Sequence, residues 1–209
     1  MNAGPWLLVT DTARVILLTG PSGSGKSSLA ARTGLPVLRL DDFYKEGGDP
    51  SLPQLPGGGT DWDAPASWDA DAATAAVHSL CTRGRAAVPV YDIGASARTG
   101  TADVRLEGGR LFLAEGIFAA EIATRCRELG LLADVLCLRG RPATTFRRRL
   151  LRDVRESRKP LPVLLARGWR LMRAEPGIVA QHVALGAHPC RAPEALTRIT
   201  AAHHTPAVA

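Results

Sequence analysis

One short segment constrains the fold of this chain more than any other: residues 20–27 satisfy the pattern G-x-x-x-x-G-K-[ST]. The apolar run 15–19 before it predicts a buried strand, and the run 26–32 predicts a helix. Glycines let backbone N–H groups fold around a polyphosphate, and a helix N-terminus favours negative charge. Strand, loop and helix in this order predict a phosphate-binding loop, the P-loop.

The residues of the P-loop have distinct expected roles. Lys26 is expected to reach the β- and γ-phosphates of a nucleotide, and the Ser27 hydroxyl to bind Mg²⁺. ATP and Mg²⁺ are therefore the expected cofactors. The residues expected to contact the nucleotide here are Gly20, Ser22, Gly23, Ser24, Gly25, Lys26, Ser27 and Ser28.

The length of 209 residues predicts one domain over residues 1–209. No apolar run approaches the roughly 20 residues that span a bilayer, and no basic region precedes the short apolar stretch near the N-terminus. Neither a membrane span nor a signal peptide is expected. The four cysteines are far apart and show no CxxC spacing, which favours a reduced cytoplasmic protein without a metal or disulfide framework.

The chain has a net charge of +6, and its basic excess gathers between residues 139 and 173. Such a cluster favours a polyanionic partner: ATP, a phosphorylated product or nucleic acid. Aromatic residues do not alternate with these arginines as a single-strand stacking surface requires, so a nucleic-acid partner is not expected. A solvated basic face is the remaining alternative. Phe146 and Trp169 are expected in the core.

Strands alternate with helices along the chain, which predicts an α/β fold with a doubly wound parallel sheet. A Gly- and Pro-rich loop, residues 45–70, is long enough to be functional. Residues 94–109 are irregular, with a hairpin arm at 104–106 as one interpretation. After Glu175 only a closing helix at 193–200 is predicted. The predicted strands are 15–19, 36–40, 86–91, 111–114 and 135–138, and the other helices are 69–83, 116–129, 142–158 and 163–173.

Ligands of such sheets bind beyond the carboxyl ends of the strands, and acidic residues follow two predicted strands there. Asp41, with Asp42 as its competitor, can accept a proton from a substrate hydroxyl, bind Mg²⁺ through water, or cap a turn. Glu115 ends an apolar strand and is expected to reach Mg²⁺ or its water shell. In the long loop, Asp63 is a candidate for binding ribose hydroxyls beside aromatic rings, whereas Asp69 is expected to cap a helix.

Arginines crowd the predicted helix 142–158, and their mutual repulsion suggests that an anion compensates them. The guanidinium group of arginine can form two hydrogen bonds to a phosphoryl group and neutralise its negative charge during transfer. An exposed basic helix with Asp153 and Glu156 as internal partners is the alternative. The crowded residues are Arg147, Arg148, Arg149, Arg152, Arg155 and Arg158.

Taken together, these motifs resemble the uridine kinase branch of the phosphoribulokinase/uridine kinase family of P-loop kinases, over about residues 15–159. Six segments occur in the family's order: the P-loop, Leu40-Asp41-Asp42-Phe43-Tyr44-Lys45, Asp61-Trp62-Asp63-Ala64-Pro65, Pro89-Val90-Tyr91-Asp92-Ile93, Ala114-Glu115-Gly116-Ile117 and Arg149-Leu150-Leu151-Arg152-Asp153.

The resemblance implies a kinase that transfers the ATP γ-phosphate to the 5′-hydroxyl of a nucleoside. Asp41 would be the general base, and Lys26 would act with Arg149 and Arg152 in catalysis. An Arg-rich lid helix, residues 141–160, would bring Arg158 to the nucleotide. The substrate-binding set would be Asp41, Tyr44, Asp63, Tyr91, Arg98 and Glu115.

Ala64 and Ser96 stand where the family has histidines, and Ile93 replaces an aromatic residue. The acceptor therefore stays open between a uridine- or cytidine-type nucleoside and nicotinamide riboside, pantothenate or a phosphosugar. The family's closing strand and adenine pocket are not recognised, with residues 186–193 as the candidate segment. A nucleic-acid-binding ATPase and a kinase-like binding protein are further alternatives, and a homo-oligomer is left open.

Overall fold

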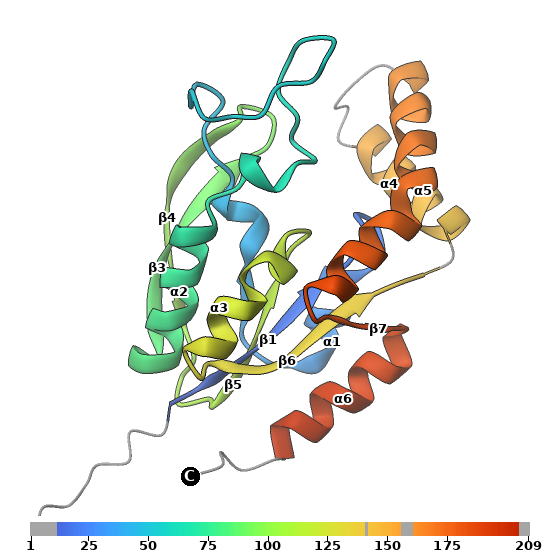
Figure 1. Ribbon diagram of the computed structural model, residues 1–209. Coiled ribbons are helices and arrows are strands. Elements are labelled where there is room, and N and C mark those ends of the chain that lie inside the picture. The colour runs from blue at the N-terminus through green and yellow to red at the C-terminus, as the bar shows by residue number, and fades with distance from the viewer. Residues whose placement is uncertain (1–11, 141, 156–160, 205–209) are drawn as a thin grey trace, which may run out of the picture.

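The computed structural model describes residues 12–140, 142–155 and 161–204. Its centre is a five-stranded parallel sheet in the order β2-β5-β1-β6-β7 (Figure 1). Parallel neighbours need crossover connections, and helices supply them here. The predicted α/β fold is confirmed. The strands are β1 (Arg14–Thr19), β2 (Val37–Arg39), β5 (Leu111–Glu115), β6 (Leu132–Leu138) and β7 (His188–Cys190).

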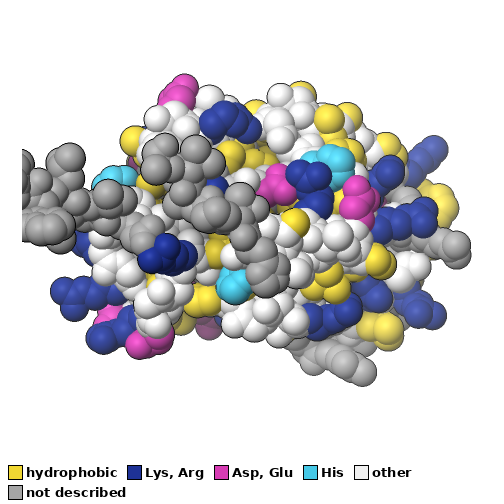
Figure 2. Space-filling view, turned by 90° about the horizontal axis from the view of Figure 1, so that it is seen from below, with side chains coloured by type: hydrophobic (Ala, Val, Ile, Leu, Met, Phe, Trp, Pro, Cys, Tyr) yellow, Lys and Arg dark blue, Asp and Glu magenta, His cyan; other side chains and the backbone are white. Residues whose placement is uncertain are grey.

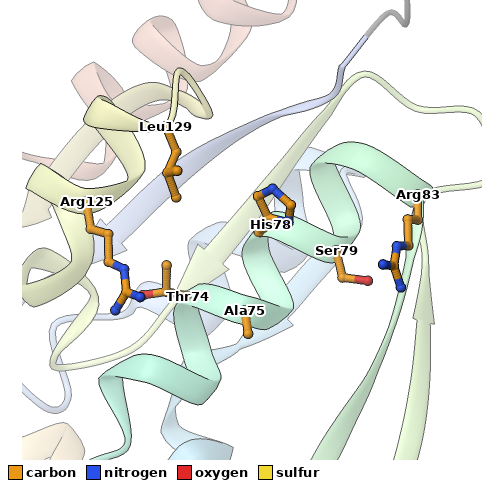
Figure 3. Close-up of a pocket in the computed structure, with 7 residues that line it drawn as sticks. All are labelled: Thr74, Ala75, His78, Ser79, Arg83, Arg125 and Leu129. Atoms are coloured by element: carbon orange, nitrogen blue, oxygen red, sulfur yellow. The ribbon is translucent and has the colours of Figure 1, made fainter.

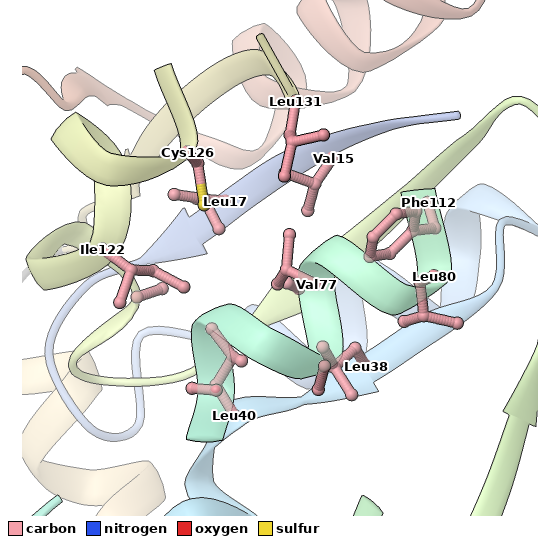
Figure 4. Close-up of a cluster of buried hydrophobic side chains, with 14 of the residues drawn as sticks. Val15, Leu17, Leu38, Leu40, Val77, Leu80, Phe112, Ile122, Cys126 and Leu131 are labelled. Atoms are coloured by element: carbon pink, nitrogen blue, oxygen red, sulfur yellow. The ribbon is translucent and has the colours of Figure 1, made fainter. Parts of the chain in front are cut away.

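Alternate side chains of β1 enter two separate cores, one on each face of the sheet. Val15 and Leu17 join the cluster under α2 (Ala70–Arg83) and α3 (Ala123–Glu128), part of which Figure 4 shows. Ile16 and Leu18 join the cluster under α1 (Lys26–Thr33) and α6 (Ala192–His204). Because strand side chains alternate between faces, a fully apolar strand must be covered on both. The sheet is therefore doubly wound, as predicted.

The predicted strand 86–91 is not part of this sheet. It forms β3 (Arg85–Asp92), which pairs antiparallel with β4 (Ala97–Arg105) in a separate two-stranded sheet. Ala86 and Val88 are buried while their neighbours are more exposed, the alternation of a strand with one covered face. Residues 94–109 do not form a hairpin by themselves: they contribute the single strand β4, whose partner β3 lies before the segment, and the expected arm 104–106 overlaps only the end of β4.

The C-terminal third differs most from the sequence-based expectation. Helix α5 (Leu161–Ala184) continues through Pro176 instead of ending at residue 173, and β7 follows it as a closing strand that was not predicted. Trp169 is 56% exposed, so its expected place in the core is wrong. Gly168 explains this, because its Cα lies against Phe146 of α4 (Pro142–Arg155), where a Cβ would come within 2.6 Å of the ring. The two helices therefore meet at Gly168.

The surface is mixed in charge on the face that Figure 2 shows. Lys and Arg side chains lie in the middle of this face as well as along its edges, with acidic and hydrophobic side chains among them (Figure 2). Within the described ranges no helix is long and apolar enough to cross a membrane. The four cysteines are buried and unpaired.

The stability of the fold should depend on the α2 core. Leu80 is fully buried (Figure 4), and Leu80→Ala should lower the free energy of unfolding by about 2–5 kcal/mol, since it removes apolar contacts and leaves a cavity. Urea unfolding followed by circular dichroism measures the change. Leu151→Ala is the control, because Leu151 is 53% exposed and its loss should cost less than about 0.5 kcal/mol. Equal effects of the two changes would contradict this packing.

Candidate functional site

The P-loop connects the end of β1 with the start of α1, as the sequence predicts. Gly20 has a φ of 134°, and a Cβ there would lie 2.3 Å from the Leu138 carbonyl oxygen. Gly25 is the N-cap of α1 with a φ of 99° and offers no side-chain cap to the first turn. The unpaired N–H groups of a helix start are natural partners for an anion.

Lys26 lies almost buried inside the loop. Its Nζ donates to the carbonyl oxygen of Gly20 at 2.8 Å and to that of Pro21 at 3.3 Å. A buried ammonium group needs such acceptors, because desolvation would otherwise be costly. These two hydrogen bonds hold the amine of Lys26 inside the P-loop. From this position a P-loop lysine can reach the phosphates of a nucleotide.

Ser27 and Glu115 come together from α1 and β5. Ser27 Oγ donates to Glu115 Oε1 at 2.8 Å. Burial raises the pKa of Glu115, the Ser27 hydrogen bond and Lys26 oppose this, and the nearby Asp41 adds to it. A hydroxyl and a carboxylate are oxygen ligands that suit Mg²⁺, which takes most of its other ligands from phosphates and water. Among the described residues no group of three or more metal-binding side chains lies together.

The structure separates the two aspartates that follow β2, which lie in the 3₁₀ turn Leu40–Phe43. Asp41 Oδ1 accepts from the backbone N–H of Ile117 at 2.9 Å, next to Glu115. Asp42 instead faces Arg39, at 3.6 Å, and accepts from the backbone N–H of Tyr91. Burial is the main cause that raises the pKa of Asp42. Asp41 therefore lies at the same sheet edge as Glu115, the partner of Ser27 in the P-loop. Asp42 is instead hydrogen-bonded to β3 of the hairpin.

Aromatic side chains hold the long loop against this edge. The ring of Tyr44 lies 5.8 Å from those of Trp62 and Tyr91 and 6.0 Å from that of Phe118. The Tyr44 hydroxyl donates to the Trp62 carbonyl oxygen at 3.2 Å, and Trp68 Nε1 donates to the Leu40 carbonyl oxygen at 2.7 Å. The Gly- and Pro-rich segment is thus pinned by buried rings.

The polar candidates of this region fall into two groups. Asp63 is exposed and lines a cleft beside the P-loop. Asp69 accepts from the Ala72 N–H at 2.9 Å, which confirms it as the cap of α2. Arg98 pairs with the same Asp69 at 3.3 Å. The Tyr91 hydroxyl donates to the Lys45 carbonyl oxygen at 3.0 Å, and burial raises the Tyr91 pKa.

The cleft beside the P-loop has a volume of about 80 Å³. Its walls come from the P-loop, the long loop, the segment through the 3₁₀ turn Ala119–Ile122, and α5. They are formed by Gly20, Pro21, Ser22, Asp63, Pro65, Ile117, Phe118, Glu121, Ile178, Gln181 and His182.

The contributions of α5 were missed from the sequence, since the helix was expected to end before them. Thr19 Oγ1 donates to the Ile117 carbonyl oxygen at 3.1 Å, so its contact of 3.2 Å with His182 Nδ1 makes the ring nitrogen the donor. Burial, with Lys26 adding to it, lowers the pKa of His182 to about 4, which keeps the ring neutral. Gln181 Nε2 donates to Glu121 Oε1 at 3.3 Å. In the sequence, only an apolar helical pattern that continues past Pro176 could have indicated that α5 reaches these residues.

One arginine of α4 approaches the P-loop directly. Arg148 Nη1 lies 3.3 Å from the position that a Cβ on Gly25 would occupy. The sequence singled out Arg149 and Arg152, which are positions of the same helix, and Arg158 lies outside the described residues. Arg148 was named there only as a member of the crowded set.

A second hollow, about 450 Å³ in volume, lies between α2 and α3 (Figure 3). It is shallow and open, and Arg125, which lines it, pairs with Asp71. None of its lining residues belongs to the P-loop or to a strand end. Its walls are Thr74, Ala75, His78, Ser79, Arg83, Arg125 and Leu129.

Comparison with known proteins supports the fold. No model of a known protein family matches the chain, and no curated protein matches it. A "putative fructose transport system kinase" from Silicibacter sp. TM1040 is 21% identical with a TM-score of 0.58, over 85% of this chain and 88% of its own. A "possible uridine kinase" from Bacillus stearothermophilus is 20% identical with a TM-score of 0.47, over 72% and 83%. The first likeness shows that the two proteins share an α/β fold.

The buried carboxylate of Glu115 should lower the stability of the fold at neutral pH. Its raised pKa means that the folded state binds a proton more readily than the unfolded state, so this residue favours folding when protonated and loses that effect as pH rises. Glu115→Gln keeps an oxygen for Ser27 and removes the charge. We expect a higher midpoint of thermal unfolding than the natural chain at pH 7, with the difference shrinking toward pH 4.5 and below.

Thermal unfolding at pH 4, 5.5 and 7 measures this difference. Glu128→Gln is the matched control, because Glu128 is exposed on α3 and its charge should matter little. An unchanged or lower midpoint for Glu115→Gln at pH 7 would contradict the assigned burial of the charge.

Proposed function

We propose that the chain is an ATP- and Mg²⁺-dependent kinase that transfers the γ-phosphoryl group to a hydroxyl of a small molecule. The observation that carries the proposal is the position of Asp41, whose carboxylate lies beside Glu115 and is held by the Ile117 N–H, at the edge that the P-loop occupies. A phosphate loop, a pair of metal ligands and a carboxylate base at one edge of the sheet are the parts that phosphoryl transfer requires.

The residues present fit a bound nucleotide. The P-loop has no side chain at Gly20 and Gly25, where the backbone bends most, and it presents helix N–H groups to an anion. Lys26 would hold the β- and γ-phosphates, with Ser22, Gly23, Ser24 and Ser28 contributing to the cradle. Ser27 and Glu115 would hold Mg²⁺. When bound, the metal ion supplies positive charge to the phosphate oxygens that gain negative charge during transfer.

Asp41 would accept the proton of the attacking hydroxyl. One of its oxygens is fixed by the Ile117 N–H, which orients the carboxylate while the other oxygen meets the substrate. Gly116 makes this possible, since a Cβ there would lie 2.9 Å from Asp41 Oδ1. General-base catalysis requires such fixed geometry before any tuning of the pKa.

The acceptor would enter between the long loop and α5. By the resemblance to uridine kinases, residues 45–70 would form the acceptor-binding loop of a single domain, with Asp63 on the acceptor's hydroxyls. Tyr44 and Tyr91 would support that loop through their ring contact. Arg98 would act on it through Asp69. A nucleoside is the first acceptor to test, and a cytoplasmic location agrees with this reaction.

Helix α4 would form part of a lid over the phosphates, residues 141–160. Arg148 supports this role, because its guanidinium lies against Gly25. Arg149, Arg152 and Arg158 are the further lid arginines that the resemblance implies. A closed lid excludes water, which would otherwise hydrolyse ATP without an acceptor.

The base assignment predicts that Asp41→Asn folds and binds ATP but loses turnover. The amide oxygen can still accept from Ile117, while proton acceptance is lost, so kcat should fall about 10²- to 10⁴-fold. Acceptor-stimulated ADP release measures turnover, and calorimetry measures ATP binding. The neighbouring Asp42→Asn is the matched control and should keep most of its activity. Near-normal turnover of Asp41→Asn would refute the assignment.

The lid assignment predicts a loss of nucleotide affinity in Arg148→Ala. Removing a guanidinium that bonds a phosphate should raise the Kd for ATP about fivefold, corresponding to about 1 kcal/mol. Calorimetric titration with Mg²⁺-ATP measures it. Arg147→Ala is the control, because the preceding residue of a helix projects about 100° away around the axis. Identical Kd values for the two variants would remove Arg148 from the site.

A further inference from the structure

The walls of the cleft beside the P-loop carry negative charge. Among the described residues that line it, Asp63 and Glu121 are carboxylates, and none is a lysine or arginine. Asp41 and Glu115 lie at the neighbouring sheet edge, since the Ile117 backbone that holds Asp41 is also a wall of the cleft. An acceptor placed here would face acidic groups.

Glu121 and Gln181 link two walls of the cleft. The 3.3 Å hydrogen bond joins the 3₁₀ turn Ala119–Ile122 to α5. A carboxylate has about four lone-pair positions, and a primary amide has two N–H groups and an acceptor oxygen, so one shared bond leaves capacity on both groups. Such groups match the hydroxyls of a polyol, which both donate and accept.

Three described cations close to this cleft have their contacts elsewhere. Lys26 is bound to the carbonyl oxygens of Gly20 and Pro21, and Arg98 is paired with Asp69. The guanidinium of Arg148 lies against Gly25, which is not a wall of the cleft. A second phosphate or a carboxylate on the acceptor would meet the like charge of the Glu121 carboxylate, and such contacts raise the energy of a partly buried site.

We propose that this cleft selects a polyhydroxylated acceptor that carries no negative charge, with Glu121 and Gln181 as the residues that set this specificity. The inference rests on the proposed kinase function. It favours nucleosides, including cationic ones, and neutral sugars as acceptors over phosphosugars and carboxylates such as pantothenate.

The test compares acceptors that differ by a phosphate and keep a hydroxyl free for transfer: ribulose with ribulose 5-phosphate, and uridine with uridine 3′-monophosphate, whose 5′-hydroxyl is free. Each is titrated calorimetrically into the protein with Mg²⁺ and a non-hydrolysable ATP analogue, and each is assayed for ADP release with ATP. We expect binding and turnover for at least one neutral member, and neither for its phosphorylated counterpart.

Two variants test the role of the pair. Glu121→Gln removes a negative charge and Gln181→Lys adds a positive one, so each raises the net charge of the cleft by one. Each variant should raise the kcat/KM for the phosphorylated acceptor, relative to that for the neutral acceptor, about tenfold. Glu128→Gln makes the same chemical change as the first variant on an exposed position of α3 and should leave the ratio unchanged. An unchanged ratio in both cleft variants would overturn the assignment of the pair.

The outcomes separate the two proposals. Turnover that favours the phosphorylated acceptor or pantothenate in the natural chain overturns the specificity inference and leaves the kinase proposal standing. Binding of the neutral acceptor without ADP release supports the cleft assignment and overturns the kinase proposal. A protein that binds the ATP analogue and none of these acceptors overturns both.

Discussion

The site depends on two buried charged groups, the ammonium of Lys26 at the start of α1 and the carboxylate of Glu115 at the end of β5. The two residues are only 6% and 7% exposed. Either charge alone would be costly to bury, and each is offset by local partners: carbonyl oxygens of the P-loop for Lys26, and the Ser27 hydroxyl for Glu115. These contacts fix the first turn of α1 against the end of β5. The arrangement lowers stability at neutral pH and keeps polar groups ready for a ligand, a trade that functional sites commonly make.

Helix α5 connects this fixed centre to the arginine-bearing helix α4. Its C-terminal half reaches β1 through His182 and Thr19, and reaches the opposite wall of the cleft through Gln181 and Glu121. Its N-terminal half packs on α4, where Phe146 lies against Gly168. A movement of α4 toward the P-loop is therefore constrained by a helix that is itself anchored at the loop.

Sequence reasoning succeeded where the determining interactions are local. The P-loop, the Asp69 cap and the α/β alternation depend on residues within a few positions of each other, so the pattern suffices. It failed where distant contacts decide: β3 has the composition of a sheet strand, but only its pairing with β4 places it in a hairpin. Helix α5 continues through Pro176 because packing outweighs the missing hydrogen bond. The residues alone did not separate Asp41 from Asp42, and only the family resemblance favoured Asp41. The Ile117 and Tyr91 N–H groups that place the two carboxylates differently lie far along the chain.

The charge of the cleft also bears on the direction of the proposed reaction. A neutral acceptor becomes a phosphate monoester with about two negative charges at neutral pH, and it gains them next to Asp63 and Glu121. Walls that accept the hydroxyls of the substrate then repel the product, unless the arginines of α4 compensate for it. The carboxylates lie on the long loop and the 3₁₀ turn Ala119–Ile122, and the arginines lie on α4. Opening of α4 would therefore remove the compensation and leave the repulsion. The same carboxylates would thus bind the acceptor and favour release of the product. The positive charge that opposes this repulsion would come from the arginines of α4 alone.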